Sequence, residues 1–170
     1  QELYQAVLAL GRQAAAEYRS RIRLLVIASY QFGLVLLDSA MQPLTGITTL
    51  LDTRAQELSS DFYAALDTRD IFRRSACPPF FQYPLARLHF FRTAQPELFE
   101  RAAWVLSSKD YLLYQLTGVL LTEPSTAGAT QLMNAESVAW DERLLDAAGL
   151  RREQLAPIVE ADGEALPLLA

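Results

Sequence analysis

The chain has 170 residues, of which 51% are hydrophobic and 21% are charged, and its formal net charge is −5. This length suits one compact domain, or a large piece of one, with a real apolar core. The acidic balance argues against nucleic acid as a partner, because binding a phosphate backbone needs clustered lysine and arginine. No apolar run reaches the length of a membrane span and no signal-peptide layout opens the chain, so we expect no membrane partner.

The cysteine and histidine content limits the chemistry further. Cys77 is the only cysteine and His89 the only histidine. A single cysteine precludes an internal disulfide and fits a reducing cytoplasm, which is the expected location. No metal ligand is assigned to the chain, because a zinc site of the usual ligand set is not expected. His89 is interpreted as a packed or surface side chain, and Cys77 as a small buried one.

The first third of the chain carries strand patterns after an initial helix. Apolar residues recur at helical spacing over residues 1–21, which predicts a helix with one apolar face. The run IRLLVIAS, residues 22–29, is typical of a strand buried on both faces. Two more strands are predicted at 32–38 and 43–51, joined by a hairpin-like connection. These consecutive strands argue against a purely helical interaction domain.

The rest of the chain is predicted to be mainly helical. A helix is expected over residues 53–66, followed by a surface loop over 67–84, which holds three prolines. Two short helices broken near Pro96 should follow over residues 85–106, and then a capped helix over 107–118. The remaining expectations are a brief strand at 119–124, a cluster of small residues at 125–130 that lets a backbone or ligand approach closely, and a helix over 141–150.

An acid and a base, Asp52 and Arg54, stand one residue apart where a predicted strand gives way to a predicted helix. As a helix N-cap, Asp52 would contribute about 1 kcal/mol. Capping does not account for Arg54, because a cation is mildly unfavourable in the first turn of a helix. We therefore expect the five donors of Arg54 to meet either a nearby acid or a ligand.

The turn SYQFG, residues 29–33, is the other candidate ligand site. It lies where one predicted strand ends and the next begins, and ligands of open α/β sheets gather outside strand ends. Ser29, Tyr30, Gln31 and Phe32 would then face a cleft. The chain contains neither a G-x-x-x-x-G-K-[ST] phosphate loop nor a G-x-S-x-G nucleophile elbow, so motifs alone assign no catalytic residue.

The order of several short motifs resembles the N-terminal half of the FGGY-type carbohydrate kinases, which phosphorylate xylulose, gluconate, glycerol and related polyols. The stretches IASYQFG, LVLLD, QPL and ITTLLDTRA follow the family order I-x-[GS]-x-x-Q-M-H-G, x-x-L-L-D, x-P-L and I-x-W-x-D-x-R-A. Further along, SSKDYLLYQLTG, EPSTAGAT and WDERLLDAAGL resemble further family segments. The resemblance covers nearly the whole chain from about residue 20 onward.

The resemblance implies an α/β fold, namely a fragment of a ribonuclease-H-like (actin-like ATPase) domain with a helical sugar-binding insertion. Residues 1–170 would be a partial N-terminal sugar-binding lobe, without its first strands and phosphate loop and without the C-terminal ATP-binding lobe. The full-length protein would transfer a phosphoryl group from ATP, with Mg²⁺, to a sugar, polyol or aldonate hydroxyl. ATP and Mg²⁺ would be bound mainly outside this segment. A homodimer is one candidate assembly.

The resemblance also implies site residues. The family's catalytic base would lie beyond the equivalent of Ala170, so no catalytic residue is expected in this segment, and the isolated segment should be inactive. The substrate-binding residues implied by position are Gln31, Phe32, Asp52, Arg54 and Phe80. The first would hydrogen-bond the substrate, the two phenylalanines would wall the pocket, and the acid–base pair would act at the pocket or hold its strand end.

The departures from the family pattern lie in the same region. Tyr30, Gln31 and Phe32 stand where the family has Gln-Met-His, and Leu50 stands where it has tryptophan. Leu85 replaces a lysine. The pocket region is therefore expected to be less polar than in relatives, which leaves the substrate open. It also supports an alternative function, a non-catalytic sugar-binding or pseudokinase module.

Overall fold

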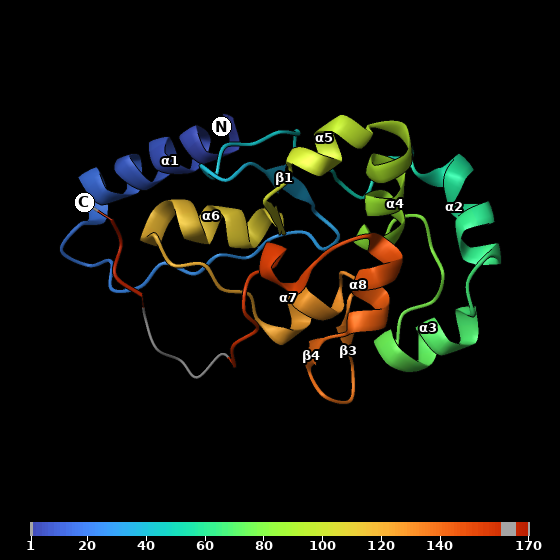
Figure 1. Cartoon of the computed structure of the whole chain (residues 1–170). Helices are drawn as coiled ribbons and strands as arrows, with labels where there is room; N and C mark the ends of the chain where they lie inside the picture. The colour runs from blue at the N-terminus through green and yellow to red at the C-terminus, as the bar shows by residue number, and fades with distance from the viewer. Residues whose placement is uncertain (1, 161–165, 170) are drawn as a thin grey trace.

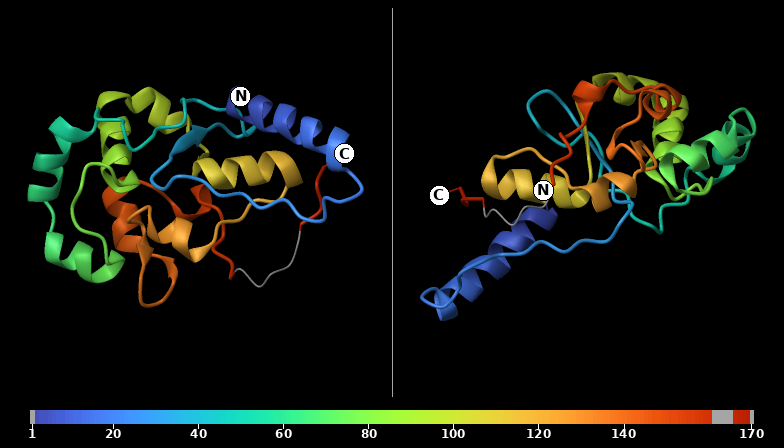
Figure 2. Two further views of the ribbon diagram at one scale, coloured as in Figure 1. Left: turned by 180° about the vertical axis from the view of Figure 1, so that it is seen from behind. Right: turned by 90° about the horizontal axis from the view of Figure 1, so that it is seen from below.

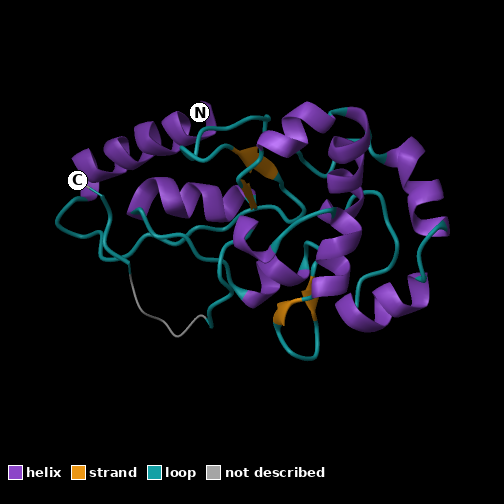
Figure 3. Ribbon diagram, viewed as in Figure 1, coloured by secondary structure: helices purple, strands orange, loops and turns teal. Residues whose placement is uncertain are grey.

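The structure is a computed structural model that describes residues 2–160 and 166–169 (Figure 1). Its helices are α1 (Glu2–Tyr18), α2 (Gln56–Ala64), α3 (Thr68–Ser75), α4 (Pro84–Ala94), α5 (Pro96–Arg101), α6 (Ser108–Thr117), α7 (Pro124–Gly128), α8 (Glu142–Ala148) and the 3₁₀ turn η1 (Arg152–Gln154). Its strands are β1 (Val35–Leu37), β2 (Trp104–Leu106), β3 (Met133–Asn134) and β4 (Ala139–Trp140). Helices therefore dominate the described residues, and the strands are short (Figure 3).

Helix α4 lies at the centre of the larger apolar core. Pro84 opens it, where a missing backbone N–H costs no hydrogen bond. Leu85, Leu88 and Phe91 are almost completely buried. The helix packs against α2, α5 and α8, which surround it (Figure 1). A helix buried on several faces explains why its sequence shows little separation into an apolar and a polar side.

The hairpin predicted over residues 32–51 is present, but its second arm is not a continuous strand. The Thr48 backbone N–H donates to the Leu34 carbonyl at 2.8 Å. Isolated antiparallel bridges join Leu34 to Thr48 and Leu37 to Pro43. The arm therefore runs alongside β1 and leads to Asp52, but it does not form a full strand.

Strand β1 finds its strand partner in β2, which the sequence did not predict. The two strands run antiparallel, with Leu36 opposite Val105. All three residues of β1 are buried. The sequence placed residues 104–106 in a helical stretch, and pairing with β1 overrides that local preference because it buries Val105 and Leu106.

The predicted buried strand at residues 22–29 is wrong for this structure. The segment follows α1 without regular secondary structure, and no strand among the described residues pairs with it. Its apolar side chains are therefore left uncovered, with Val26 79% exposed and Leu24 64% exposed. Seen from below, α1 and the chain that follows it project away from the rest of the molecule (Figure 2).

Helix α1 confirms the predicted helix over residues 1–21, but it buries none of the residues described in it. Its contact with the body includes the Tyr4 hydroxyl, which donates to the Gln115 carbonyl of α6 at 3.2 Å. Leu10 on this helix is 66% exposed. Together, α1 and residues 22–26 leave an apolar surface open. No helix in the described ranges has both the length and the hydropathy to cross a bilayer.

Helix α3 corrects the surface loop predicted over residues 67–84. The Asp67 side chain accepts hydrogen bonds from the backbone N–H groups of Arg69 and Asp70, both at 3.1 Å. Ala76 ends the helix in the left-handed conformation, with φ 56°. The three prolines that favoured a loop all follow this helix, so they do not interrupt it.

The other predicted helices are confirmed. Ser107 caps α6 by accepting from the Asp110 backbone N–H at 3.0 Å, and Gly118 ends it with φ 72°. Gly149 ends α8 in the same left-handed conformation, with φ 76°. Pro96 begins α5 directly after α4. Helix α2 begins at Gln56, a few residues later than predicted.

The segment after α6 differs from the prediction. Residues 119–124 form no strand, and only Thr122 makes an isolated parallel bridge to Ile158. Helix α7 follows, and Glu123 caps it by accepting from the backbone N–H groups of Ser125 and Thr126 at 2.7 and 3.1 Å. The same carboxylate pairs with Lys109 of α6. Glu123 therefore ties α6 to α7.

This arrangement predicts an acid-dependent loss of stability. Burial raises the pKa of Glu123, but hydrogen bonds from Lys109, Thr126 and Ser125 outweigh it and lower the pKa from 4.5 to about 2. A depressed carboxyl pKa contributes stability that is complete above the unfolded value and lost as pH falls through the folded value. The stability advantage of the unsubstituted chain over Glu123→Gln should therefore be full above pH 4.5 and shrink towards pH 2.

Urea denaturation at a series of pH values measures this difference. The matched control is Glu57→Gln, which removes an exposed carboxylate from the first turn of α2. The loss for Glu123→Gln between these two pH values should exceed any change seen with the control. An advantage over Glu123→Gln that stays constant down to pH 2 would contradict the role assigned to this carboxylate.

Candidate functional site

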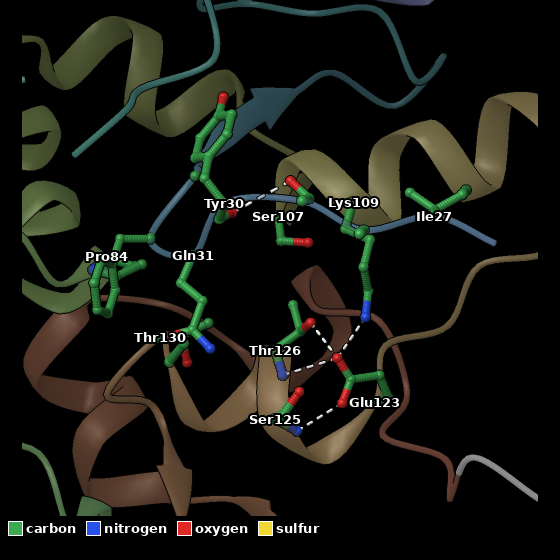
Figure 4. A pocket seen from close by; sticks show the side chains of 15 residues that line it. Ile27, Tyr30, Gln31, Pro84, Ser107, Lys109, Glu123, Ser125, Thr126 and Thr130 are labelled. Carbon is green, nitrogen blue, oxygen red and sulfur yellow. Dashed lines mark hydrogen bonds and ion pairs between the residues drawn. The ribbon is translucent and has the colours of Figure 1, made fainter. Parts of the chain in front are cut away.

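A cavity of about 200 Å³ opens beside the turn of residues 29–33 (Figure 4). Its walls come from this turn, from Pro84 at the start of α4, from the first turn of α6 and from α7. Hydroxyl, amide and charged groups line it, among them Gln31, Lys109, Glu123, Ser125, Thr126 and Thr130. The cavity therefore offers several hydrogen-bonding groups within one small space.

The ion pair of Lys109 and Glu123 forms one wall of the cavity. In Figure 4, the Lys109 side chain extends from α6 to the Glu123 carboxylate, which also accepts from the Thr126 hydroxyl. With a pKa of about 2, this carboxylate stays ionised and is a weak base at neutral pH. A general base works best with a pKa near the operating pH, so Glu123 is suited to holding the wall rather than to abstracting a proton.

Gln31 and Phe32 line this cavity, as does Tyr30. The Gln31 side chain lies towards Thr130, whereas the Tyr30 side chain extends away on the other side of the turn (Figure 4). The Phe32 ring meets the Tyr83 ring edge-on, with 4.9 Å between ring centroids. Of the predicted substrate-binding residues, Gln31 and Phe32 lie together at the cavity.

Phe32 has an unusual backbone conformation, with φ 64°. A bulky residue in the left-handed region is an outlier that its surroundings must hold in place. The Phe32 carbonyl accepts a hydrogen bond from Arg87 of α4. Gly33 comes next, and a Cβ there would lie 2.6 Å from the Ser108 hydroxyl oxygen, so only glycine fits against α6 without displacement.

Arg87 is a site-supporting residue that the sequence analysis did not identify. Its side chain also donates to the Thr49 carbonyl at 2.6 Å and to the Thr48 hydroxyl at 3.3 Å. The residue is only 2% exposed, and this burial lowers the pKa of its guanidinium. One sequence signal was present, namely an arginine inside the apolar run that forms α4, where a charged side chain needs partners.

Asp52 and Arg54 form a pair with each other. Arg54 Nε and one terminal nitrogen donate to the two Asp52 oxygens at 2.9 and 2.6 Å. This hydrogen bonding is the largest cause of the lowered pKa of Asp52. The Arg54 guanidinium also lies over the Phe90 and Phe91 rings, 5.4 and 5.5 Å from their centroids. The nearby acid expected for Arg54 is therefore Asp52 itself.

The expectation that Asp52 caps the following helix is wrong. The N-cap position of α2 belongs to Ala55, which provides no side-chain cap. Asp52 instead accepts from the Arg54 backbone N–H at 3.1 Å within a turn. Neither residue lines the cavity. Substrate contact by this pair therefore stays a prediction.

Phe80 lies outside the cavity lining, and its side chain is about half exposed. Its carbonyl accepts from the Tyr63 hydroxyl at 3.2 Å. The same hydroxyl donates to the Gln131 side chain at 2.6 Å, and Gln131 in turn donates to the Pro78 carbonyl at 2.9 Å. The fully buried Gln131, which the sequence analysis missed, thus helps to fix the loop that carries Phe80.

The only histidine and the only cysteine lie away from the cavity lining. The His89 ring stacks on Phe62 with 4.3 Å between centroids, which confirms it as a packed side chain. Cys77 is half-buried, and burial raises the pKa of its thiol. In residues 2–160 and 166–169, no group of three His, Cys, Asp or Glu side chains is placed to hold a metal ion.

Comparison with known proteins identifies relatives of this chain. Residues 1–165 match the model of the FGGY family of carbohydrate kinases, N-terminal domain. The chain is 24% identical over 160 residues to gluconokinase of Bacillus subtilis, covering 94% of this chain and 31% of that protein. It is 30% identical over 146 residues to the putative sugar kinase YoaC of the same organism, covering 86% and 29%.

Solved structures agree with this relationship. Ligand-bound xylulose kinase from Lactobacillus acidophilus superposes with a TM-score of 0.84 at 23% identity, covering 97% of this chain and 34% of that structure. The chain thus spans about a third of the length of the relatives that it matches. Its fold is that of an α/β fragment matching the actin-like N-terminal domain. The chain belongs to the FGGY family of carbohydrate kinases and corresponds to their N-terminal domain.

Proposed function

We propose that this chain forms much of the sugar-binding lobe of a kinase that transfers a phosphoryl group from ATP to a hydroxyl of a sugar, polyol or aldonate. One observation carries the proposal: in a chain of this family, a cavity lined by an amide, several hydroxyls and an ion pair opens beside Gln31. A polyhydroxylated molecule both donates and accepts hydrogen bonds, and these groups complement it.

The predicted substrate-binding residues would each have a different role in binding the acceptor. The Gln31 amide can donate to and accept from neighbouring hydroxyls at once. Phe32, braced by the Tyr83 ring, would supply an apolar wall, and Phe80 a second one in the complete protein. Asp52 and Arg54 form a bidentate pair of hydrogen bonds with each other. This favours a role for the pair in holding the end of the hairpin arm rather than in binding the substrate.

The chain is proposed to be part of a larger lobe. The exposed apolar side chains of residues 22–26 support this, because an extended apolar segment without a strand partner is suited to pairing with further chain. The greater length of the relatives supports it as well. A cytoplasmic location agrees with the single free cysteine, Cys77, and a homodimeric assembly stays a prediction.

ATP and Mg²⁺ are implied by the family, and the described residues offer few groups that would hold the metal ion. They provide no cluster of three metal-ligating side chains, and the Glu123 carboxylate is already fully engaged. We therefore assign metal binding mainly to chain outside residues 1–170, and the family resemblance implies the same for the nucleotide and the catalytic base. What this segment contributes is binding and orientation of the acceptor, which are a large part of phosphoryl-transfer catalysis.

A non-catalytic sugar-binding module is the second candidate function. It is favoured by Phe32 at the turn and by the half-exposed Leu50 at the end of the hairpin arm, because neither side chain provides a polar group for a substrate. Such a module would use the same cavity and the same Gln31 amide. It differs from a kinase in one measurable respect, since it would bind sugar without turning over ATP.

A ligand screen of the full-length protein tests the sugar-binding role. D-gluconate, D-xylulose and glycerol, each with and without ATP and Mg²⁺, should include one acceptor that raises the melting temperature. Stabilisation at a hundredfold excess over Kd is about 2.7 kcal/mol. Gln31→Ala should abolish most of the shift, while Gln56→Ala, on the exposed side of α2, should retain it. Absence of any shift with all three acceptors would contradict sugar binding.

Turnover assays separate the two candidate functions. We expect the full-length protein to phosphorylate the stabilising acceptor in an assay coupled to ADP release, because a kinase must couple binding to transfer. We expect residues 1–170 alone to show neither acceptor phosphorylation nor ATP hydrolysis, because the family resemblance implies a catalytic base and an ATP-binding lobe outside this segment. Turnover by the segment alone would refute this division of labour, and binding without turnover by the full-length protein would favour the non-catalytic module.

A further inference from the structure

Arg87 is a buried cation whose hydrogen-bond partners are neutral; burial lowers the pKa of its guanidinium, and the charge of Asp52 offsets part of this. Its side chain is among the most completely buried in the molecule, on a helix whose neighbouring positions are Leu85 and Leu88. Within the described residues it forms no ion pair. A charged group removed from water is costly unless its donors are satisfied, so the partners that it does have must be well placed.

Those partners are neutral oxygens from two separate segments. One terminal nitrogen donates to the Phe32 carbonyl and to the Thr48 hydroxyl, and the other donates to the Thr49 carbonyl. The first contact lies in the turn beside the cavity. The other two lie at the end of the hairpin arm that leads to Asp52. One guanidinium therefore connects the turn and the end of the hairpin arm by hydrogen bonds.

The backbone of the turn needs a contact that holds its conformation. Phe32 lies in the left-handed region with φ 64°, which a phenylalanine rarely adopts without support. Its carbonyl orientation and its ring position are both fixed, the first by Arg87 and the second by Tyr83. Gln31 precedes it directly, so the direction in which the Gln31 amide enters the cavity depends on the backbone at Phe32.

We infer that Arg87 is a positioning residue for acceptor binding, which acts through the Phe32 carbonyl to aim Gln31 into the cavity. The inference rests on the proposed function. Arg87 does not line the cavity, so it would have no contact with the acceptor itself. Its loss should therefore weaken acceptor binding while leaving nucleotide binding untouched.

Steady-state kinetics of the full-length protein test this role. Arg87→Met keeps the length of the side chain and removes all its donors. The acceptor is whichever of D-gluconate, D-xylulose and glycerol has the highest kcat/KM. We expect its KM to rise about tenfold or more, and the KM for ATP to stay within about twofold, because hydrogen bonds from a charged group are among the stronger ones.

Further variants separate positioning from general damage to the fold. Arg87→Lys keeps one cationic donor group and should recover part of the acceptor KM. Thr48→Val removes only the weaker contact, at 3.3 Å, and should raise the acceptor KM less than Arg87→Met does. Arg92→Met, on the exposed side of the same helix, is the matched control and should leave both KM values unchanged.

Hydrogen exchange on the full-length protein provides a readout that needs no activity. In Arg87→Met, amides of residues 30–34 and 48–52 should exchange about tenfold faster, while those of α8 should stay as they are. Faster exchange in a protein without kinase activity would uphold the positioning and refute the proposed function. Unchanged exchange in both segments, or equal rises in the KM for acceptor and for ATP, would overturn the inference.

Discussion

A single buried guanidinium constrains the part of this structure where ligand binding is proposed. Arg87 belongs to α4, the helix around which the larger core is packed, so its position is set by the core itself. Its two terminal nitrogens donate to the oxygens of Phe32, Thr48 and Thr49, whereas its buried Nε has no partner among the described residues. The core therefore dictates where the turn and the hairpin arm lie, because neither can move without leaving a buried cation unpaired.

A second buried polar side chain supports the opposite loop in the same way. Gln131 is completely buried, adopts φ 63°, and contacts both Tyr63 and the loop that carries Phe80. Phe32 and Gln131 thus each combine a strained left-handed backbone with a polar contact, the first at the cavity and the second at the loop that carries Phe80. Strain of this kind persists only where the surroundings fix it, and it is often found where a ligand must be met by a prearranged surface.

The sequence predicted what depends on local signals. Helix ends followed from residues such as Ser107 and Gly118, and the family followed from short motifs in their order. Prediction from sequence was wrong where the structure of a segment depends on a partner distant in the chain. Residues 22–29 have the pattern of a buried strand, but no described strand pairs with them. The contact from Arg87 to Phe32 spans 55 residues, so no local pattern could have revealed it. Gln31, which lines the cavity, was predicted from its local motif position, whereas Arg87, which supports the turn, was not predicted.

The most direct test of the central role of Arg87 is a high-resolution crystal structure of the Arg87→Met variant beside that of the unsubstituted chain. The constraint described above predicts that Phe32 leaves the left-handed region, where its φ is now 64°, and that Gln31 turns away from Thr130. It also predicts that the end of the hairpin arm at Thr49 separates from the turn. A variant that retains the φ of Phe32 and the direction of Gln31 would contradict it, because the core would then hold the turn without the guanidinium.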